Sequence, residues 1–175
     1  GGVNFSAVHG TLSAEAAKSL GIGAGDFFAT GVSIVLHPAN PWVSIIHMNV
    51  RYFEAGDTWW FGGGIDASPH YISLEESAEF HNKLKKSCDS TNPSYYARFK
   101  KWADDYFYIK HRHETRGIGG IFFDRLTSPE ISKSAGLDFI LGVGQTFLPA
   151  YNDLFVPNFE KPFVATHKNW QLISR

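Results

Sequence analysis

The chain has 175 residues, a formal net charge of -1, 43% hydrophobic residues and 15% aromatic residues. These values predict a folded domain with a sizeable core, and they exclude a disordered chain and the basic surface typical of nucleic-acid-binding proteins. No apolar run approaches the ~20 residues that cross a bilayer, and the first ten residues lack a signal-peptide pattern. The single cysteine, Cys88, cannot form an internal disulfide, which is usual in a reducing compartment. We therefore expect a cytoplasmic protein with no transmembrane segment and no nucleic-acid partner.

The first elements that the sequence predicts are strands. Two apolar runs, residues 31–37 and 42–53, flank the tetrapeptide PANP, which favours a tight connection between antiparallel strands. Residues 57–66 predict a third strand, although three consecutive glycines weaken its strand propensity. Another strand is expected later in the chain, over residues 117–126.

Helix-start signals follow the early strands. Ser73 and Glu76 form a capping box, which predicts a helix through about Cys88. Asn92-Pro93 predicts the start of a second helix that runs through Ile109, and Ser128-Pro129 predicts a third that includes residues 137–148. Strands in an early block, followed by helices, favour the α+β class, with a mostly antiparallel sheet covered by helices.

One face of the central strand carries an unusual row of polar side chains. Successive side chains of a strand point to opposite sides, so His47, Asn49 and Arg51 share one face. The neighbouring strands place more residues on that face: Ser33, His37, Thr58, Trp60, Gly62, Gly64 and Asp66. The two glycines remove bulk, which suits a flat, wide ligand bordered by Trp60 and Arg51.

A polar row on a strand is often simply the solvated face of an antiparallel sheet, and a lone histidine is more often structural than catalytic. The row on the second strand, however, contains no Lys, Glu or Thr, and Ile45, Phe53 and Trp60 flank it. Large apolar side chains of this kind are not normally left in water together. We therefore interpret the face as a ligand site.

Charged residues gather again between residues 106 and 124. His111, Arg112 and Arg116 end a predicted helix, where cations favour the helix dipole. Together with Arg51, the two arginines indicate an anionic ligand. The chain has no HExxH, CxxC, GxSxG or P-loop motif, which argues against hydrolase and NTPase functions. Histidines on separate elements leave a metal site open as an alternative.

Three long segments carry a resemblance to a known family: GVSIVLHPANPWVSIIHMNVRYF, DTWWFGGGIDASPHY and YFYIKHRHETRGIGGIFFD. In this order they resemble the oxygen-dependent coproporphyrinogen III oxidases, and the resemblance extends from GVNFSAVHG to WQLISR. It implies an α+β fold in which a large, mostly antiparallel sheet is sandwiched between helices, and it implies a homodimer. The implied reaction converts two propionates of coproporphyrinogen III to vinyl groups, giving protoporphyrinogen IX, carbon dioxide and hydrogen peroxide in heme biosynthesis. Molecular oxygen is the implied co-substrate, without an organic cofactor.

The resemblance also implies roles for the polar face. His47 matches the family's proton donor, and Asp66 matches an aspartate of the glycine-rich motif that meets pyrrole N–H groups. Substrate-binding positions are matched by Ser33, Asn49, Val50 and Arg51. Loss of a pyrrole proton would create an electron-rich anion that reacts with oxygen directly. In the less favoured alternative, a divalent metal binds to the counterparts of His37, His47, His81 and His111.

Members of this family are longer than 175 residues, and this chain does not begin with methionine. We therefore expect residues 1–175 to be a single domain that is incomplete at both ends. A targeting segment before residue 1 would make the protein mitochondrial. A truncated or inactive porphyrin-binding domain is the alternative function. A carbohydrate-binding module is a weaker alternative, because Arg51, Arg112 and Arg116 favour an anion over a neutral sugar.

Overall fold

A computed structural model describes residues 1–174 of the chain. Five strands form one sheet in the order β1-β2-β3-β4-β7, and every neighbouring pair is antiparallel. These strands are β1 (Gly2–Thr11), β2 (Asp26–Leu36), β3 (Ile45–Ala55), β4 (Thr58–Ser68) and β7 (Gly119–Leu126). A short hairpin, β5 (Tyr108–Ile109) with β6 (Glu114–Thr115), lies directly before β7 in the sequence.

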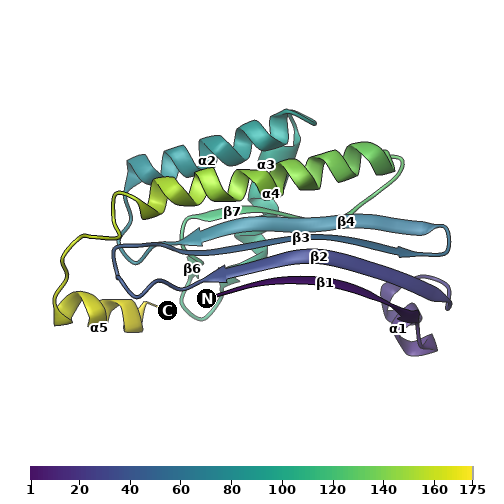
Figure 1. Cartoon of the computed structure of the whole chain (residues 1–175), viewed down its shortest axis with the longest axis horizontal. Coiled ribbons are helices and arrows are strands. Elements are labelled where there is room, and N and C mark those ends of the chain that lie inside the picture. Colours follow the sequence, from purple (N-terminus) through teal and green to yellow (C-terminus); the bar gives the residue numbers. More distant parts are fainter. Residues whose placement is uncertain (175) are drawn as a thin grey trace.

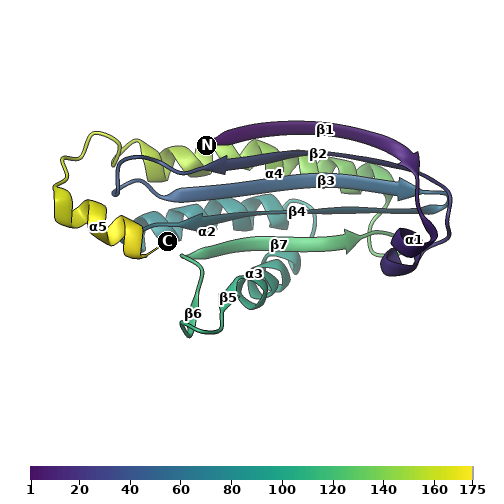
Figure 2. The same cartoon turned by 90° about the horizontal axis from the view of Figure 1, so that it is seen from below.

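The helices are α1 (Ala14–Leu20), α2 (Leu74–Asp89), α3 (Tyr95–Tyr106), α4 (Lys133–Phe155) and α5 (Ala165–Ile173). Figure 1 shows α2 and α4 side by side over one face of the sheet, and Figure 2 shows α3 beside the edge strand β7. The α+β class and the antiparallel sheet are confirmed. In residues 1–174, however, the helical layer covers one face only, and α1 and α5 lie at the two ends of the other face.

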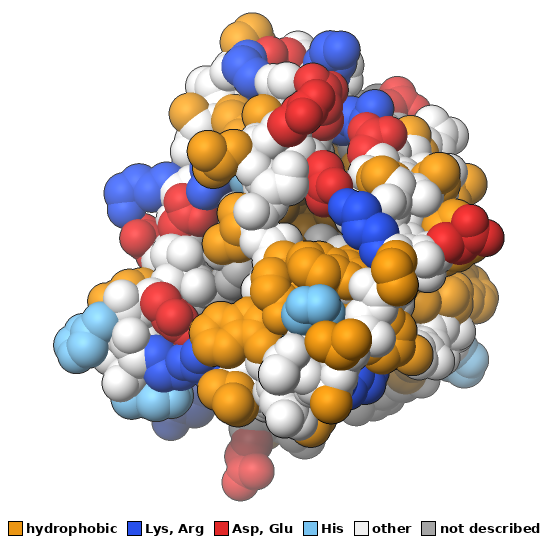
Figure 3. Space-filling model, turned by 90° about the vertical axis from the view of Figure 1, so that its left-hand side faces the viewer, with side chains coloured by type: hydrophobic (Ala, Val, Ile, Leu, Met, Phe, Trp, Pro, Cys, Tyr) orange, Lys and Arg blue, Asp and Glu red, His pale blue; other side chains and the backbone are white. Residues whose placement is uncertain are grey.

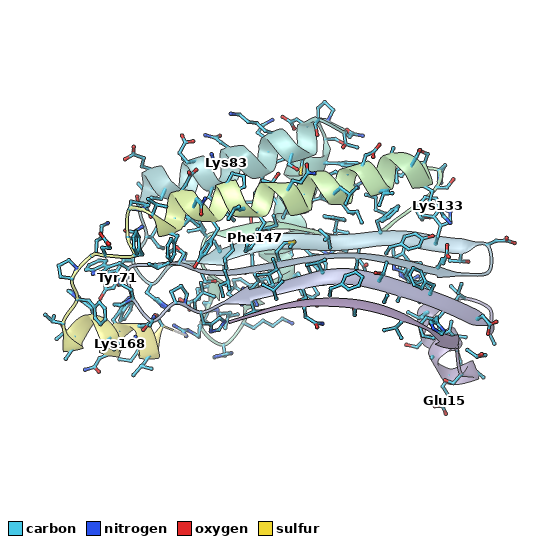
Figure 4. All side chains as sticks on the ribbon, viewed as in Figure 1. Glu15, Tyr71, Lys83, Lys133, Phe147 and Lys168 are labelled. Carbon is cyan, nitrogen blue, oxygen red and sulfur yellow. The ribbon has the colours of Figure 1, made fainter. Side chains whose placement is uncertain are left out.

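The main core fills the space between the helical layer and the sheet. Phe80 and Leu84 of α2 are fully buried there, as are Ile46 and Ile65 of the sheet. Phe147 points from α4 toward the sheet (Figure 4) and belongs to the same cluster. Because the core takes the apolar face of β3 and β4, the polar side chains of these strands are left on the opposite face.

Helix caps follow the local sequence. The Ser73 hydroxyl accepts a hydrogen bond from the Glu76 amide at 3.2 Å, and α2 runs to Asp89. The helix and its Ser73 cap are thus confirmed, but the Glu76 side chain accepts a hydrogen bond from Nδ2 of Asn158 at 3.0 Å instead of completing a capping box. The predicted start of the third helix at Ser128-Pro129 is wrong, because Ser132 caps α4 by accepting a hydrogen bond from the Ala135 amide at 3.2 Å.

Other boundaries differ from the sequence prediction. Helix α3 begins at Tyr95, two residues after the expected proline, and ends at Tyr106 instead of running through Ile109. The chain then reverses its direction, and the Arg116 amide donates a hydrogen bond to the Phe107 carbonyl at 3.3 Å. The strand predicted from residue 31 begins at Asp26. Strand β1, helices α1 and α5 and the β5–β6 hairpin were not predicted.

Helix α5 is attached to the end of the sheet by aromatic contacts. The Trp42 ring lies 4.3 Å from the Tyr71 ring and 4.8 Å from the His167 ring, measured between centroids. The Trp42 indole also donates to the Pro162 carbonyl at 3.0 Å. Figure 3 views the molecule from this end, where hydrophobic side chains gather in the lower half. Among the described residues, none of the helices is both long enough and apolar enough to span a membrane.

Candidate active site

The register of the sheet brings the predicted polar residues together. His47 of β3 lies directly opposite Asp66 of β4, and Ser33 of β2 lies opposite Asn49. On the β4 side, Arg51 lies opposite Gly62. Alternation along each strand puts all these positions on the face opposite α2 and α4. The polar face predicted from the sequence is therefore present.

Asp66 is the buried acid of this face, with a side chain that is only 4% exposed. Its Oδ2 atom lies 3.3 Å from Nδ1 of His47 and accepts a hydrogen bond from Nη2 of Arg116 at 2.8 Å. A carboxylate that is removed from water needs such partners, because an unpaired buried charge is strongly unfavourable. The partners come from β3 and from the loop before β7, so two separate segments hold this acid in place on β4.

Arg51 has a different set of partners. Its Nη1 donates to Oδ1 of Asn49 at 2.8 Å, and its Nη2 donates to Oδ1 of Asp124 at 3.0 Å. Its side chain is 38% exposed, so it remains open to solvent. A guanidinium carries five N–H donors, which leaves donors on Arg51 for a bound carboxylate.

Three adjoining hollows follow the polar face. The central one, of about 210 Å³, is lined by Ser33, Asn49, Asp66 and Arg116. A hollow of about 310 Å³ continues from it past His47. The third, of about 420 Å³, shares Ser33, Asn49 and Arg51 with the central one. We call this row of three hollows the trough.

The far end of the trough is aromatic. Trp60, Phe53 and Phe27 stack in sequence, with ring centroids 4.2 Å apart for the first pair and 6.0 Å apart for the second. The Arg125 guanidinium lies 5.1 Å above the Trp60 ring. Trp60 is only 8% exposed within this stack, so this end of the trough is an aromatic wall beside Arg125, and a border role for Trp60 and Arg51 stays a prediction.

The glycines of β4 do not serve the purpose that the sequence indicated. A Cβ atom at Gly62 would lie 2.6 Å from Oδ1 of Asp124 and 2.8 Å from Nε of Arg51. A Cβ atom at Gly64 would lie 2.4 Å from the Ile121 carbonyl oxygen. Gly62 thus makes room for the Arg51–Asp124 ion pair, and Gly64 permits the close approach of β7. Neither position simply clears space for a ligand.

The Val50 side chain lies apart from the trough. Its side chain packs against the core on the helical face and lines a separate apolar groove. Its neighbours in the chain, Asn49 and Arg51, line the trough. Because side chains alternate along a strand, the Val50 side chain points to the face opposite those of Asn49 and Arg51, and its predicted role in substrate binding stays a prediction.

The four histidines of the metal alternative are not gathered into one ligand set. The rings of His37 and His47 lie 5.6 Å apart between centroids, but Nδ1 of His47 faces Asp66. Nε2 of His81 donates to the Ile118 carbonyl at 2.8 Å, and its Nδ1 accepts from the Tyr96 hydroxyl at 3.1 Å. Residues 1–174 contain no group of three or more His, Cys, Asp or Glu side chains that could hold a metal ion. The residues present therefore do not fit the proposed metal site.

Burial changes the acid–base behaviour of two groups outside the trough. It lowers the pKa of His81 from its ordinary value, although the Ile118 hydrogen bond acts in the opposite direction. Burial also raises the pKa of the Cys88 thiol to about 12. A thiol with such a pKa forms almost no thiolate at neutral pH, so Cys88 is not a nucleophile.

Two contributors to the site were not identified from the sequence. Asp124 extends from β7 to Arg51, and Phe107 lies under Arg116, whose Cζ atom is 3.9 Å from the ring centroid. The alternation of Phe122 and Asp124 in β7 was the available signal. It could not show which strand β7 would pair with, because that pairing joins residues about 60 positions apart in the chain.

Comparison with known proteins places this geometry in a family. The family model described as coproporphyrinogen III oxidase matches residues 1–175. The chain belongs to the coproporphyrinogen III oxidase family. Relatives in this family include the oxygen-dependent coproporphyrinogen-III oxidase of Drosophila melanogaster, which is 44% identical over 99% of this chain and 47% of its own length.

Two further relatives have an organelle in their names. The mitochondrial oxygen-dependent coproporphyrinogen-III oxidase of Homo sapiens is 44% identical over 99% of this chain and 41% of its own length. The chloroplastic coproporphyrinogen-III oxidase 1 of Arabidopsis thaliana is 44% identical over 99% of this chain and 49% of its own length. The chain thus spans about half the length of these coproporphyrinogen oxidases.

Within a coproporphyrinogen oxidase, this arrangement has a clear chemical capacity. Asp66 offers a fixed carboxylate oxygen next to the His47 imidazole, and Arg51 offers a partly exposed cation on the same face, four residues along β3 from His47. Such a face can hold a carboxylate-bearing ring and move protons at one point of it.

Proposed function

We propose that the protein which contains this chain oxidatively decarboxylates two propionates of coproporphyrinogen III to vinyl groups, giving protoporphyrinogen IX. In each round, one propionate loses carbon dioxide and two hydrogen atoms, and one oxygen molecule takes these hydrogens to become hydrogen peroxide. The observation that carries the proposal is the pairing of His47 with Asp66 beside Arg51 on one open sheet face. Family membership supports the choice of substrate.

We assign the steps to residues as follows. Arg51 grips a propionate by charge-assisted hydrogen bonds, while Asn49 and Ser33 orient the ring. Asp66 accepts the pyrrole N–H proton, and His47 acts as the proton donor. The electron-rich pyrrole anion then reacts with oxygen, and the resulting peroxide takes a hydrogen from the propionate as carbon dioxide leaves. This scheme uses molecular oxygen as co-substrate and requires neither an organic cofactor nor a metal.

An aerobic assay tests the proposal. Coproporphyrinogen III is incubated with the protein that contains this chain and, separately, with residues 1–175 alone. Oxidised porphyrins are then separated and measured by fluorescence. We expect protoporphyrin from the longer protein in air and none without oxygen. If the longer protein binds the substrate but yields no product, the alternative function, an inactive porphyrin-binding domain, replaces this one.

Two further properties belong to the same proposal. The homodimer is supported by the family resemblance, and sedimentation equilibrium of the longer protein should give twice the monomer mass. The cytoplasm stays the predicted compartment, with the mitochondrion as the alternative. The relatives in human and Arabidopsis are named mitochondrial and chloroplastic, so fractionation of the source cell should decide between the two compartments.

A further inference from the structure

Arg116 is held against the sheet by an unusual piece of backbone. The following residue, Gly117, has a φ angle of +60°, and a Cβ atom there would lie 2.3 Å from the Ala67 carbonyl oxygen. The Ile118 amide donates to that same carbonyl at 3.0 Å. Only glycine fits such a close approach with positive φ. The loop before β7 is therefore pinned to the end of β4, one residue beyond Asp66.

The Arg116 side chain is clamped between an aromatic ring and the acid. Its Cζ atom lies 3.9 Å from the centroid of the Phe107 ring, and its Nη2 donates to Oδ2 of Asp66 at 2.8 Å. Stacking on a ring fixes the plane of a guanidinium in a way that a lysine ammonium cannot reproduce. The ring and the acid together therefore fix the orientation of the guanidinium, and with it the side from which Arg116 contacts Asp66.

The two hydrogen-bonding contacts of the Asp66 side chain use the same oxygen. Both His47 and Arg116 lie against Oδ2, and Oδ1 has no hydrogen-bond partner among residues 1–174. Asp66 also lines the central hollow of the trough. A carboxylate that is held by one oxygen has a fixed rotation, and its second oxygen remains available for a ligand.

A second observation sets Arg116 apart from a purely structural ion pair. Its Nε atom is buried and has no hydrogen-bond partner within the part of the chain that the structure describes. An unsatisfied buried donor typically costs about 1–3 kcal/mol. The loop thus holds the guanidinium where Nη2 contacts Asp66, although Nε goes without a hydrogen bond in that position.

We infer that Arg116 is a positioning residue, which orients the Asp66 carboxylate so that Oδ1 receives the pyrrole N–H. The inference rests on the proposed function and deepens it, because it separates the two arginines of the site. Arg51 grips the substrate, whereas Arg116 acts through Asp66. The rival role for Arg116 is direct binding of a propionate by the exposed part of its guanidinium, since the side chain is 37% exposed.

Steady-state kinetics of four variants in the protein that contains this chain test the inference: Arg116→Gln, Asp66→Asn, the double variant and Arg98→Gln. Arg98 is the matched control, because it is an arginine that pairs with a surface acid, Glu130, and lines none of the three hollows. We expect Arg116→Gln to lower kcat about 100-fold, the typical effect of a misplaced catalytic group, with KM changed less than about threefold. Arg98→Gln should keep both parameters within about twofold.

The double variant supplies the deciding measurement. If Arg116 acts only through Asp66, Arg116→Gln should cause no further loss of kcat in the Asp66→Asn background, as expected for residues that work as a unit. Multiplicative losses, or a raised KM with normal kcat, would overturn the inference in favour of direct propionate binding. Normal kcat for Asp66→Asn would also overturn it.

Two controls keep these outcomes distinct. Circular dichroism reports folding, and if Arg116→Gln is unfolded, Arg116→Lys carries the same test, because it keeps the charge and loses the planar stack. For Arg116→Lys we expect a kcat loss of about 10-fold or more, again absent in the Asp66→Asn background. Failure of the wild-type protein to convert coproporphyrinogen would be a failure of the proposed function itself.

Discussion

The two arginines of the trough differ in the exposure of their acidic partners. The side chain of Asp124, which pairs with Arg51, is 35% exposed, whereas that of Asp66, which pairs with Arg116, is 4% exposed. A partly solvated ion pair contributes little and is easily exchanged for another partner. Arg51 can therefore turn to a substrate carboxylate, while the Arg116 pair stays intact.

Replacement of Arg51 by alanine should raise KM and change kcat little. The guanidinium grips a carboxylate in both the ground state and the transition state, which is uniform binding. Loss of one such charged contact typically costs about 1.5–3 kcal/mol, or roughly 10- to 150-fold in KM. Steady-state kinetics check this result. Arg98→Ala, which removes a surface pair with Glu130, is the control and should leave KM unchanged.

Replacement of Asp66 by asparagine should act on kcat instead. The amide keeps the shape of the side chain but cannot accept the pyrrole proton, so kcat should fall by roughly 10²- to 10⁴-fold. His47→Ala should also lower kcat, because it removes the proton donor. Kinetics of both variants, with circular dichroism to verify folding, make the measurement. A near-normal kcat for Asp66→Asn would leave this residue with an orienting role only.

Buried His81 predicts a pH dependence of stability. Burial lowers the pKa of His81 below its ordinary value of 6.5, so below that pH the unfolded chain binds a proton that the folded chain does not. The free energy of unfolding should therefore fall as the pH drops below 6.5, by at most about 1.4 kcal/mol per pH unit for this group. Urea unfolding of the wild type and His81→Gln from pH 7.5 to 5 checks this, and equal slopes would contradict it.

At the scale of elements, the sequence predicted which side chains share a strand face better than it predicted where each helix or strand begins and ends. The alternation in β3 was enough to place His47, Asn49 and Arg51 on one face, because strand periodicity is a local property. The start of α4 was missed because two serine-based signals compete there, and tertiary packing selects Ser132. The pairing of Arg116 with Asp66 depends on a 50-residue separation, which no local pattern encodes.

Helix α4 contains two glycines whose replacement by alanine should change the free energy of unfolding in opposite directions. A Cβ atom at Gly136 would lie 2.4 Å from the buried Phe61 ring, whereas one at Gly142 meets only the Ser87 hydroxyl oxygen at 3.9 Å. Gly136→Ala should destabilise the protein by about 1–3 kcal/mol through overpacking. Gly142→Ala should stabilise it by about 0.5–1 kcal/mol, because alanine is the better helix former. Urea unfolding of both variants measures the difference, and effects of the same sign would contradict the packing described for Phe61.

At the scale of the whole molecule, the class and the sheet were predictable because strands and helices occupy separate blocks of the sequence. The placement of α2 and α4 on a single face of the sheet was not predictable, since the sequence of an amphipathic helix does not show which sheet face it will cover. The open second face is a consequence of that choice. Within residues 1–174 it leaves the trough along the sheet accessible from solvent.

Activity of the protein that contains this chain should survive exhaustive chelation. The donor atoms argue for this result, because Nδ1 of His47 faces Asp66 and both ring nitrogens of His81 are already hydrogen-bonded within the protein. The proposed chemistry also needs no metal, since a deprotonated pyrrole is electron-rich enough to react with oxygen itself. Coproporphyrinogen turnover is measured in air after dialysis against a strong chelator, with an anaerobic sample as the control. Activity that is lost on dialysis and restored by one specific metal would contradict this prediction and would place His37, His47, His81 and His111 back among the candidate ligands.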